Sequence, residues 1–204
     1  MCKNSFPVFT QANGNELWVL LLEKAWAKIH GSFDRIVAGM AHTTMRDLTG
    51  APGYEYIIAE TEDMFEKIME ADQKNHCIAT GCGQKDSDKA ALKELGLVTE
   101  HSYGIIQAAE VVGSNGQKAR ICKLRNPWGK FEWNGDWGDS SDLWTDDLKQ
   151  EFNVVEEDDG CFWMDIEDMK RYFDRVQICK YEDNYIYSCD KKQDVDFAAY
   201  KIQI

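Results

Sequence analysis

Apolar side chains recur at helical spacing in two segments of the first half of the chain. Between residues 15 and 30, leucine, alanine and isoleucine return every three or four positions, and Gly31 then ends the pattern. A similar spacing runs from Thr61 to Asn75. Both segments are predicted to be helices with one buried face. A shorter helix is expected near residues 34–40, and glycine and proline break residues 48–53 into a loop.

The pattern becomes β-like after residue 100. Residues 101–112 and 117–126 are apolar and rich in β-formers, and Gly113-Ser114-Asn115-Gly116 joins them. This arrangement predicts a β-hairpin. Further strands are expected at 76–81, 161–164 and 176–180, and helical segments at 145–152, 165–173 and for one turn within 84–96. Helices followed by mostly antiparallel strands predict an α+β fold.

The two ends of the chain lack these patterns. Residues 1–14 resemble an extended lead-in that closes with a turn at Asn13-Gly14. Residues 181–204 form a tail, and its last part, 197–204, could be a strand that begins a following domain. One domain is therefore expected over residues 15–180.

The composition indicates a soluble, acidic protein. Of the 204 residues 44% are hydrophobic, and the net charge is −13. No apolar run approaches the ~18 residues of a transmembrane segment, and the acid excess argues against a nucleic-acid partner while leaving cation binding open. The N-terminus has no signal-peptide pattern, and the seven cysteines are odd in number and scattered. We therefore expect reduced thiols in the cytoplasm.

The predicted hairpin brings together two polar residues that suit catalysis. His101 opens its first strand and Asn126 closes its second, and the midpoint between them falls on the predicted turn. Pro127 favours an extended backbone at Asn126, which would hold the amide at the rim of the sheet. An amide oxygen beside an imidazole N–H fixes the ring without adding charge, as a thiol protease requires. Trp128 is expected to cover that contact and keep water from it.

Five ordered groups of motifs resemble the calpain family of cysteine proteases, over roughly residues 9–180. They are Gly14 through Lys28 with Gly31-Ser32-Phe33 and Leu48-Thr49-Gly50, then His101-Ser102-Tyr103, Arg125-Asn126-Pro127-Trp128-Gly129, Glu132 through Ser141, and Asp159-Gly160-Cys161-Phe162-Trp163-Met164.

The resemblance implies an intracellular, calcium-activated endopeptidase that acts on proteins. Its papain-like core is split into two halves, and this chain is similar to the second half, an antiparallel β-sheet unit with N-terminal helices. His101 and Asn126 match the catalytic histidine and asparagine. The nucleophilic cysteine would come in cis from the preceding half, because no segment here resembles it and none of the seven cysteines is a credible substitute. The chain alone is therefore expected to be inactive.

The resemblance also implies a calcium site in this half. By position, Glu132, Asp139 and Asp159 match side-chain ligands, and Glu157 matches a ligand through its backbone carbonyl. Oxygen ligands clustered on loops suit a hard cation. Cys161 stands where the family often carries a further acid, so the site would depend on water or on nearby Asp158. The alternative is a solvated acidic loop without an ion.

A second departure from the family lies directly before the catalytic histidine. Glu100 occupies a position where the family usually has glycine, and it adds bulk and charge to the expected cleft. Glu100 and Cys161 together leave a second hypothesis open, that of an inactive calpain-like module that binds calcium or protein partners. The tryptophans are expected to be structural: Trp18 and Trp26 in a helix core, and Trp133, Trp137 and Trp163 between the loop and the strands.

Overall fold

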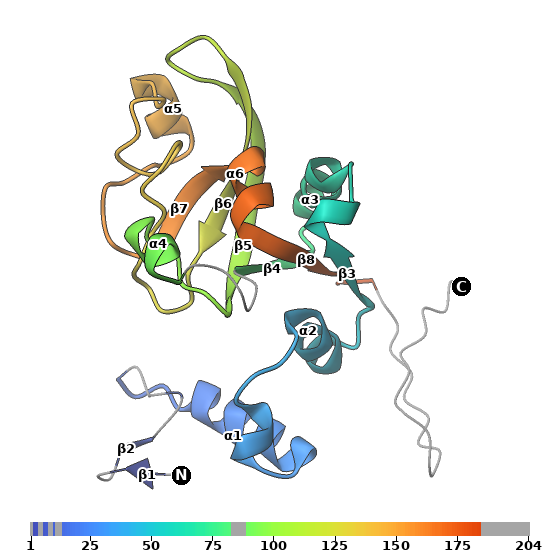
Figure 1. Ribbon diagram of the computed structural model, residues 1–204. Coiled ribbons are helices and arrows are strands. Elements are labelled where there is room, and N and C mark those ends of the chain that lie inside the picture. Colours follow the sequence, from blue (N-terminus) through green and yellow to red (C-terminus); the bar gives the residue numbers. More distant parts are fainter. Residues whose placement is uncertain (1, 4–5, 8–9, 11–13, 83–88, 185–204) are drawn as a thin grey trace. The chain divides into compact units, whose positions relative to one another are not determined.

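A computed structural model describes residues 2–3, 6–7, 10, 14–82 and 89–184 of the chain (Figure 1). Contacts divide the chain into two compact units, residues 1–40 and 41–204. The predicted lead-in falls partly, and the possible strand at 197–204 entirely, outside the described residues. Within those residues, no helix is both long and apolar enough to cross a membrane.

The first unit is built around one helix. Two short strands, β1 (Cys2–Lys3) and β2 (Phe6–Pro7), pair antiparallel near the start of the chain. The helix α1 (Trp18–His30) follows them and confirms the helix predicted at 15–30. The helix expected at 34–40 is wrong: a 3₁₀ helix, η1 (Phe33–Ile36), stands there, and Gly39 disfavours a longer helix.

The tryptophans of α1 are not the core residues that the sequence suggested. Trp18 is 62% exposed, and Ala27 is the one residue of this helix that the structure describes as buried. Trp26 is partly buried and its ring contacts that of His30 at a tilt of 52°, with centroids 4.4 Å apart. Leu21 and Ile29 of this helix are also exposed, at 65% and 76%.

The second unit contains a six-stranded sheet in the order β3-β8-β4-β5-β6-β7, in which every neighbouring pair is antiparallel. The α+β class with an antiparallel sheet is thus confirmed. The strands are β3 (Gly53–Ile57), β4 (Cys77–Cys82), β5 (His101–Val112), β6 (Lys118–Arg125), β7 (Cys161–Asp165) and β8 (Phe173–Cys179). The helices are α2 (Ala41–Thr49), η2 (Ile58–Glu60), α3 (Met64–Gln73), α4 (Lys89–Glu94), α5 (Asp146–Glu151) and α6 (Ile166–Tyr172).

The predicted hairpin is the longest feature of the sheet. Strands β5 and β6 extend beyond the shorter β4 and β7 on either side (Figure 1), since β4 pairs only with the first five residues of β5. The pairing runs from Val112 opposite Lys118 to Gly104 opposite Arg125, with a β-bulge between Ile105 and Gln107. These contacts bring the start of β5 and the end of β6 to the same end of the hairpin.

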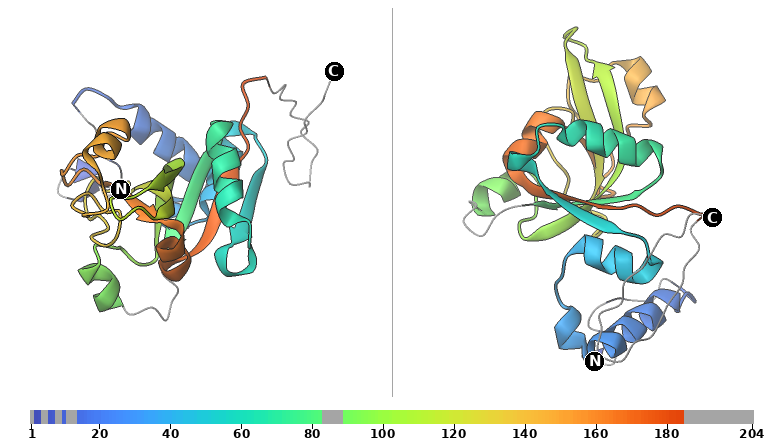
Figure 2. Two further views of the ribbon diagram at one scale, coloured as in Figure 1. Left: turned by 90° about the horizontal axis from the view of Figure 1, so that it is seen from above. Right: turned by 90° about the vertical axis from the view of Figure 1, so that its right-hand side faces the viewer.

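Alternation along the strands produces a core on each face of the sheet. On β7, Phe162 and Met164 belong to the larger core, which α3 and α6 cover, while Trp163 between them belongs to a smaller core. Trp137 and Trp144 also belong to that smaller core, and Leu148 of α5 packs against it. Figure 2 shows the helices and the sheet of this unit in two further views. Trp133, Trp137 and Trp163 are all buried, as expected for structural tryptophans.

Two elements of this unit differ from the prediction. Helix α2 begins at Ala41 and β3 begins at Gly53, where the sequence suggested no helix and only the end of a loop. Strand β3 pairs with β8, and Gly53 lies against α2 so closely that an added Cβ would come within 2.7 Å of the His42 carbonyl oxygen. Tertiary pairing therefore determines both elements, and their local patterns are weak.

Candidate active site

Asn126 is fully buried and its side chain is fixed on both sides. It follows β6, and its backbone N–H donates to the Gly160 carbonyl at 2.7 Å. Its Nδ2 donates to the carbonyls of Lys130 at 2.7 Å and Phe131 at 3.3 Å, while its Oδ1 accepts from the Trp128 N–H at 3.1 Å. These partners settle which amide atom is the oxygen, because only an oxygen can accept from a backbone N–H.

His101 is the first residue of β5, and its ring meets that amide. Its Nε2 lies 2.9 Å from the Asn126 Oδ1. Because this oxygen only accepts, Nε2 must carry the proton of the neutral ring, which leaves Nδ1 as the basic nitrogen. Among the residues that the structure describes, none is hydrogen-bonded to Nδ1. The structure therefore brings His101 and Asn126 together as the sequence suggested, with one ring nitrogen available.

Aromatic rings enclose the imidazole. The Trp128 ring lies 4.5 Å from the His101 ring between centroids, and Tyr103 meets it edge-on at 5.1 Å. Tyr103 is almost completely buried, while Trp128 is 56% exposed. Trp128 thus flanks the histidine as expected, but it also presents more than half of its own surface outward.

Glu100 occupies a strained backbone position directly before the histidine. Its φ is 53°, in the left-handed region that favours glycine. Its carboxylate forms an ion pair with Lys89 of α4, at 2.7 Å between Oε2 and Nζ. The glycine expected here from the family would remove both the bulk of Glu100 and this strain.

Two of the four expected calcium ligands lie against each other. Burial, followed by the charges of Glu132 and Asp159, raises the pKa of Asp139 to about 7. Burial also raises the pKa of Glu132, although the N–H of Gly160 donates to its Oε1 at 2.6 Å. Both carboxylates resist ionisation mainly because they are partly buried, and Asp139 also because other carboxylates lie near it. A bound divalent cation would favour their charged forms.

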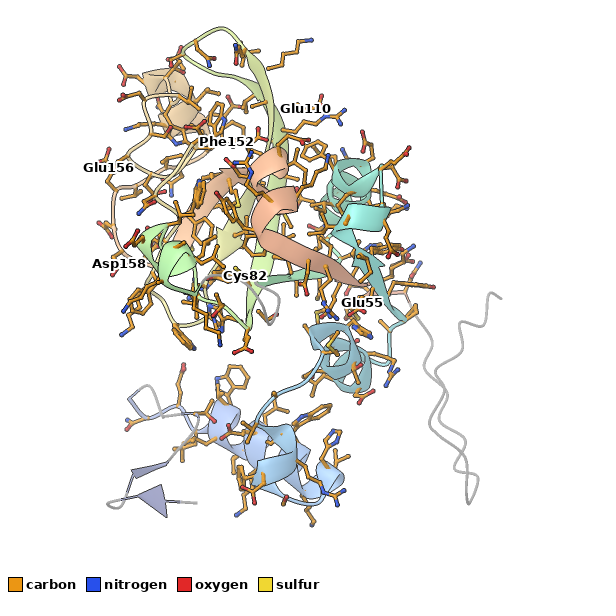
Figure 3. All side chains as sticks on the ribbon, in the orientation of Figure 1. Glu55, Cys82, Glu110, Phe152, Glu156 and Asp158 are labelled. Carbon is orange, nitrogen blue, oxygen red and sulfur yellow. The ribbon has the colours of Figure 1, made fainter. Side chains whose placement is uncertain are left out.

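The remaining expected ligands lie on the segment before β7, where Figure 3 marks Asp158. The Glu157 carbonyl accepts from the Asp159 N–H at 2.9 Å, and Asp159 Oδ1 accepts from the Cys161 N–H at 2.7 Å. Asp158 Oδ1 accepts from the Phe131 N–H at 2.9 Å, which joins the two loops. Within residues 14–82 and 89–184, no three acidic, histidine or cysteine side chains converge closely enough to hold a metal ion as they stand.

Four of the five cysteines whose side chains the structure describes are poorly suited to act as a nucleophile, and the fifth, exposed Cys77, lies at the opposite end of β4 from the residue that pairs with His101. Cys82, marked in Figure 3, lies directly opposite His101 in the register of β4 and β5. It is nevertheless buried, its thiol faces the Tyr172 carbonyl, and burial raises its pKa to about 12. Burial likewise raises the pKa values of Cys122, Cys161 and Cys179. A thiol that stays protonated is a poor nucleophile.

Gly160 belongs to the site, although no role for it was predicted from the sequence. Its φ is 85°, and an added Cβ would lie 2.8 Å from both the Asn126 carbonyl oxygen and the Gly129 Cα. Its own carbonyl binds the Asn126 N–H, and its N–H binds Glu132. The sequence signal was a glycine between acidic residues and a strand, which indicates a turn but not its partners.

Comparison with known proteins gives one consistent family. The description "Calpain family cysteine protease" matches residues 1–180. Calpain-9 of Mus musculus is 38% identical over 87% of this chain, and the Calpain-1 catalytic subunit of the same species is 35% identical over 82%. Calpain-type cysteine protease ADL1 of Oryza sativa subsp. japonica is 32% identical over 85% of the chain. The chain spans 26%, 24% and 8% of these three proteins respectively. The chain belongs to the calpain family of cysteine proteases.

Proposed function

We propose that this chain supplies the histidine and asparagine of a calcium-dependent cysteine endopeptidase that cleaves proteins in the cytoplasm. The nucleophilic cysteine would come from a preceding half of the full-length protein. One observation carries the proposal: the 2.9 Å contact between His101 Nε2 and the fully buried, fully hydrogen-bonded Asn126 amide. The family membership supports cysteine-protease chemistry, and this contact supports the role of these two residues in it.

The chemistry follows from the orientation of the ring. With Nε2–H donated to Asn126, the Nδ1 lone pair of His101 accepts the proton of the cysteine thiol that the preceding half would supply. The resulting imidazolium stabilises the thiolate and later returns the proton to the amine of the departing peptide. Asn126 holds the ring through both transfers and stays neutral, so it does not compete with the thiolate for the positive charge.

The loop between β6 and β7 would hold the calcium ion. Calpains are calcium-dependent as a family, and two carboxylates whose pKa values burial raises, those of Glu132 and Asp139, support a cation site in this chain. Bound calcium would supply positive charge that neutralises these carboxylates. Asp159 and the Glu157 carbonyl would complete the ligands, and each is at present engaged in a local hydrogen bond.

The proposal is tested by restoring the missing half. The chain combined with the preceding half in calcium is expected to hydrolyse an unstructured peptide, and His101→Ala should abolish turnover. A matched variant, His76→Ala, changes a histidine outside this site and should retain it. Turnover that survives in His101→Ala would contradict the assignment.

A second candidate function rests on Glu100 and Cys161. An acid at a left-handed position beside His101, and a thiol in place of an acidic ligand, would suit a calpain-like module that binds calcium or protein without catalysis. A residue other than cysteine at the nucleophile position of the preceding half would favour this function. A cysteine there, with hydrolysis as described above, would exclude it.

A further inference from the structure

An apolar pocket adjoins the proposed catalytic histidine. It has a volume of about 300 Å³. Its lining includes Val98, the almost completely buried Leu97, and the residues Trp128 and Phe131. The two rings meet edge-on, with centroids 6.3 Å apart, and the Trp128 ring contacts the His101 ring. The Trp128 ring thus contacts the His101 ring on one side and the Phe131 ring on the other. Through Trp128, the imidazole adjoins the pocket that Trp128 and Phe131 line.

The two aromatic side chains that line this pocket are exposed to solvent. Trp128 is 56% exposed and Phe131 is 43% exposed, an uncommon exposure for two adjacent large aromatic residues. Phe131 has a φ of 65°, a left-handed conformation that is costly for a residue with a side chain. Hydrogen bonds fix this backbone, because the Phe131 N–H donates to Asp158 and its carbonyl accepts from Asn126. The ring is therefore held outward beside Trp128.

The charge around the pocket has the opposite sign to that of the protein. The chain carries a net charge of −13, yet Lys89 and Lys93 line the pocket, and the Lys130 Nζ lies 5.2 Å from the centre of the Phe131 ring. Glu100 pairs with Lys89 and offsets its charge. Among the residues described by the structure, neither Lys93 nor Lys130 forms an ion pair. Within the described part of the chain, two lysines without an ion pair therefore border an apolar floor, and the nearby Asp158 carboxylate accepts from the Phe131 N–H.

From this arrangement we infer that the pocket is a substrate subsite for an acidic side chain close to the cleaved bond. The inference rests on the proposed protease function and names a substrate class for it. The peptide would lie across Trp128, and an Asp or Glu residue would enter the pocket with its methylene groups on the aromatic rings and its carboxylate at Lys93 and Lys130. The path from the His101 ring to the Phe131 ring is on the order of 10 Å, so the acidic residue would lie about three positions or fewer from the scissile bond.

Direct binding to the 204-residue chain tests the subsite without requiring catalysis. The probes are ten-residue peptides, blocked at both ends, that carry Glu at one position at a time, with a matched set that carries Gln. The readout is the indole N–H signal of Trp128 in the NMR spectrum of the ¹⁵N-labelled chain, which is assigned among the seven tryptophans with Trp128→Phe. Buried Trp163 serves as an internal control.

We expect Glu peptides to bind about fivefold more tightly than their Gln counterparts, as for one partly exposed ion pair. The double variant Lys93→Met/Lys130→Met should abolish this preference, and Lys93→Glu/Lys130→Glu should reverse it, so that the Gln peptides bind more tightly than the Glu peptides. Lys118→Met, which removes a lysine at the far end of the hairpin, should leave the preference unchanged. Equal binding of the two peptide sets, or no shift of the Trp128 signal at millimolar peptide, would overturn the inference.

Cleavage by the full-length protein separates this inference from the proposed function. Hydrolysis of Glu and Gln peptides at equal rates would retain the protease and reject the acidic subsite. An acidic preference in binding, without hydrolysis in the presence of the preceding half and calcium, would retain the subsite and reject the protease.

Discussion

The backbone N–H of Asn126 donates to the carbonyl of Gly160, and this hydrogen bond of 2.7 Å joins the candidate catalytic residue to the acidic loop. The N–H of Gly160 in turn donates to Glu132 Oε1 at 2.6 Å. One residue thus contacts both Asn126, which lies against the His101 ring, and a proposed calcium ligand. A bound ion that moved the Glu132 carboxylate would change its hydrogen bond with the Gly160 N–H. The carbonyl of that same glycine accepts from Asn126. This geometry supports a coupling between cation binding and the orientation of the histidine.

Substituting Gly160 by alanine should disrupt this junction. The left-handed backbone and the contact of the new Cβ with the Asn126 carbonyl oxygen are together expected to cost about 3 kcal/mol. Thermal unfolding should show a Tm lower by roughly 6–12 °C. The control is Gly116→Ala in the hairpin turn, which has a φ of 77° and open space around it and should cost only about 1 kcal/mol. Equal losses in the two variants would contradict the role of Gly160.

The calcium-free chain should lose stability as the pH rises through the titration of Asp139. Its pKa in the folded chain is about 7, above the ordinary aspartate value of 3.8. The stability that protonated Asp139 contributes is therefore fully present below pH 3.8 and is lost as the pH rises through 7. At and above neutral pH, Asp139→Asn is therefore expected to raise the stability by about 1 kcal/mol after solvent screening, or roughly 3 °C in Tm. Asp142→Asn, at an exposed position of the same loop, is the control. A lower Tm in Asp139→Asn would contradict this assignment.

The thiol at Cys161 should weaken calcium binding. Adding a carboxylate there, in Cys161→Asp, is expected to lower the Kd for calcium by on the order of tenfold, because affinity grows with ligand charge. Cys161→Ser removes the thiol without adding charge and should change the Kd little. Isothermal titration calorimetry with calcium measures both variants. The absence of heat at millimolar calcium in all three proteins would indicate a solvated acidic loop instead of a cation site.

Glycine in place of Glu100 should open the cleft at little cost in stability. The left-handed strain that is relieved and the extra entropy of glycine in the unfolded chain nearly cancel, so the free energy of unfolding should change by less than about 0.5 kcal/mol. In the restored protease, Glu100→Gly should raise kcat/KM. The comparison variant is Glu100→Gln, which removes the charge and keeps the strain. Equal rates in wild type and Glu100→Gly would show that Glu100 does not hinder the substrate.

The central pair of the site was predictable because it depends on a local hairpin. The turn at Gly113-Ser114-Asn115-Gly116 determines the register, and the register brings His101 near Asn126. The bulge after Ile105 changes the pairing by one residue and was not evident from the sequence. The hydrogen bond from Asn126 to Gly160 was also not predictable, because Gly160 lies on a segment 34 residues later in the chain that only the folded sheet brings close.

The elements that were missed depend on distant partners. Helix α2 and strand β3 are held by β8, which lies more than 100 residues later in the chain. Trp18 shows the converse: a regular apolar spacing predicts a helical face correctly, but it does not identify what covers that face. The pocket beside Trp128 was likewise hidden, since Lys93 and Phe131 meet only through the fold.

The protonation of the His101 ring tests the central claim most directly. The neutral imidazole should carry its proton on Nε2, because the Asn126 Oδ1 is committed to accepting hydrogen bonds. Nitrogen NMR of the ¹⁵N-histidine-labelled chain distinguishes the two ring nitrogens, and Asn126→Ala should allow the other tautomer to appear. A neutral His101 protonated mainly on Nδ1, or a tautomer that is unchanged in Asn126→Ala, would contradict the proposed orientation.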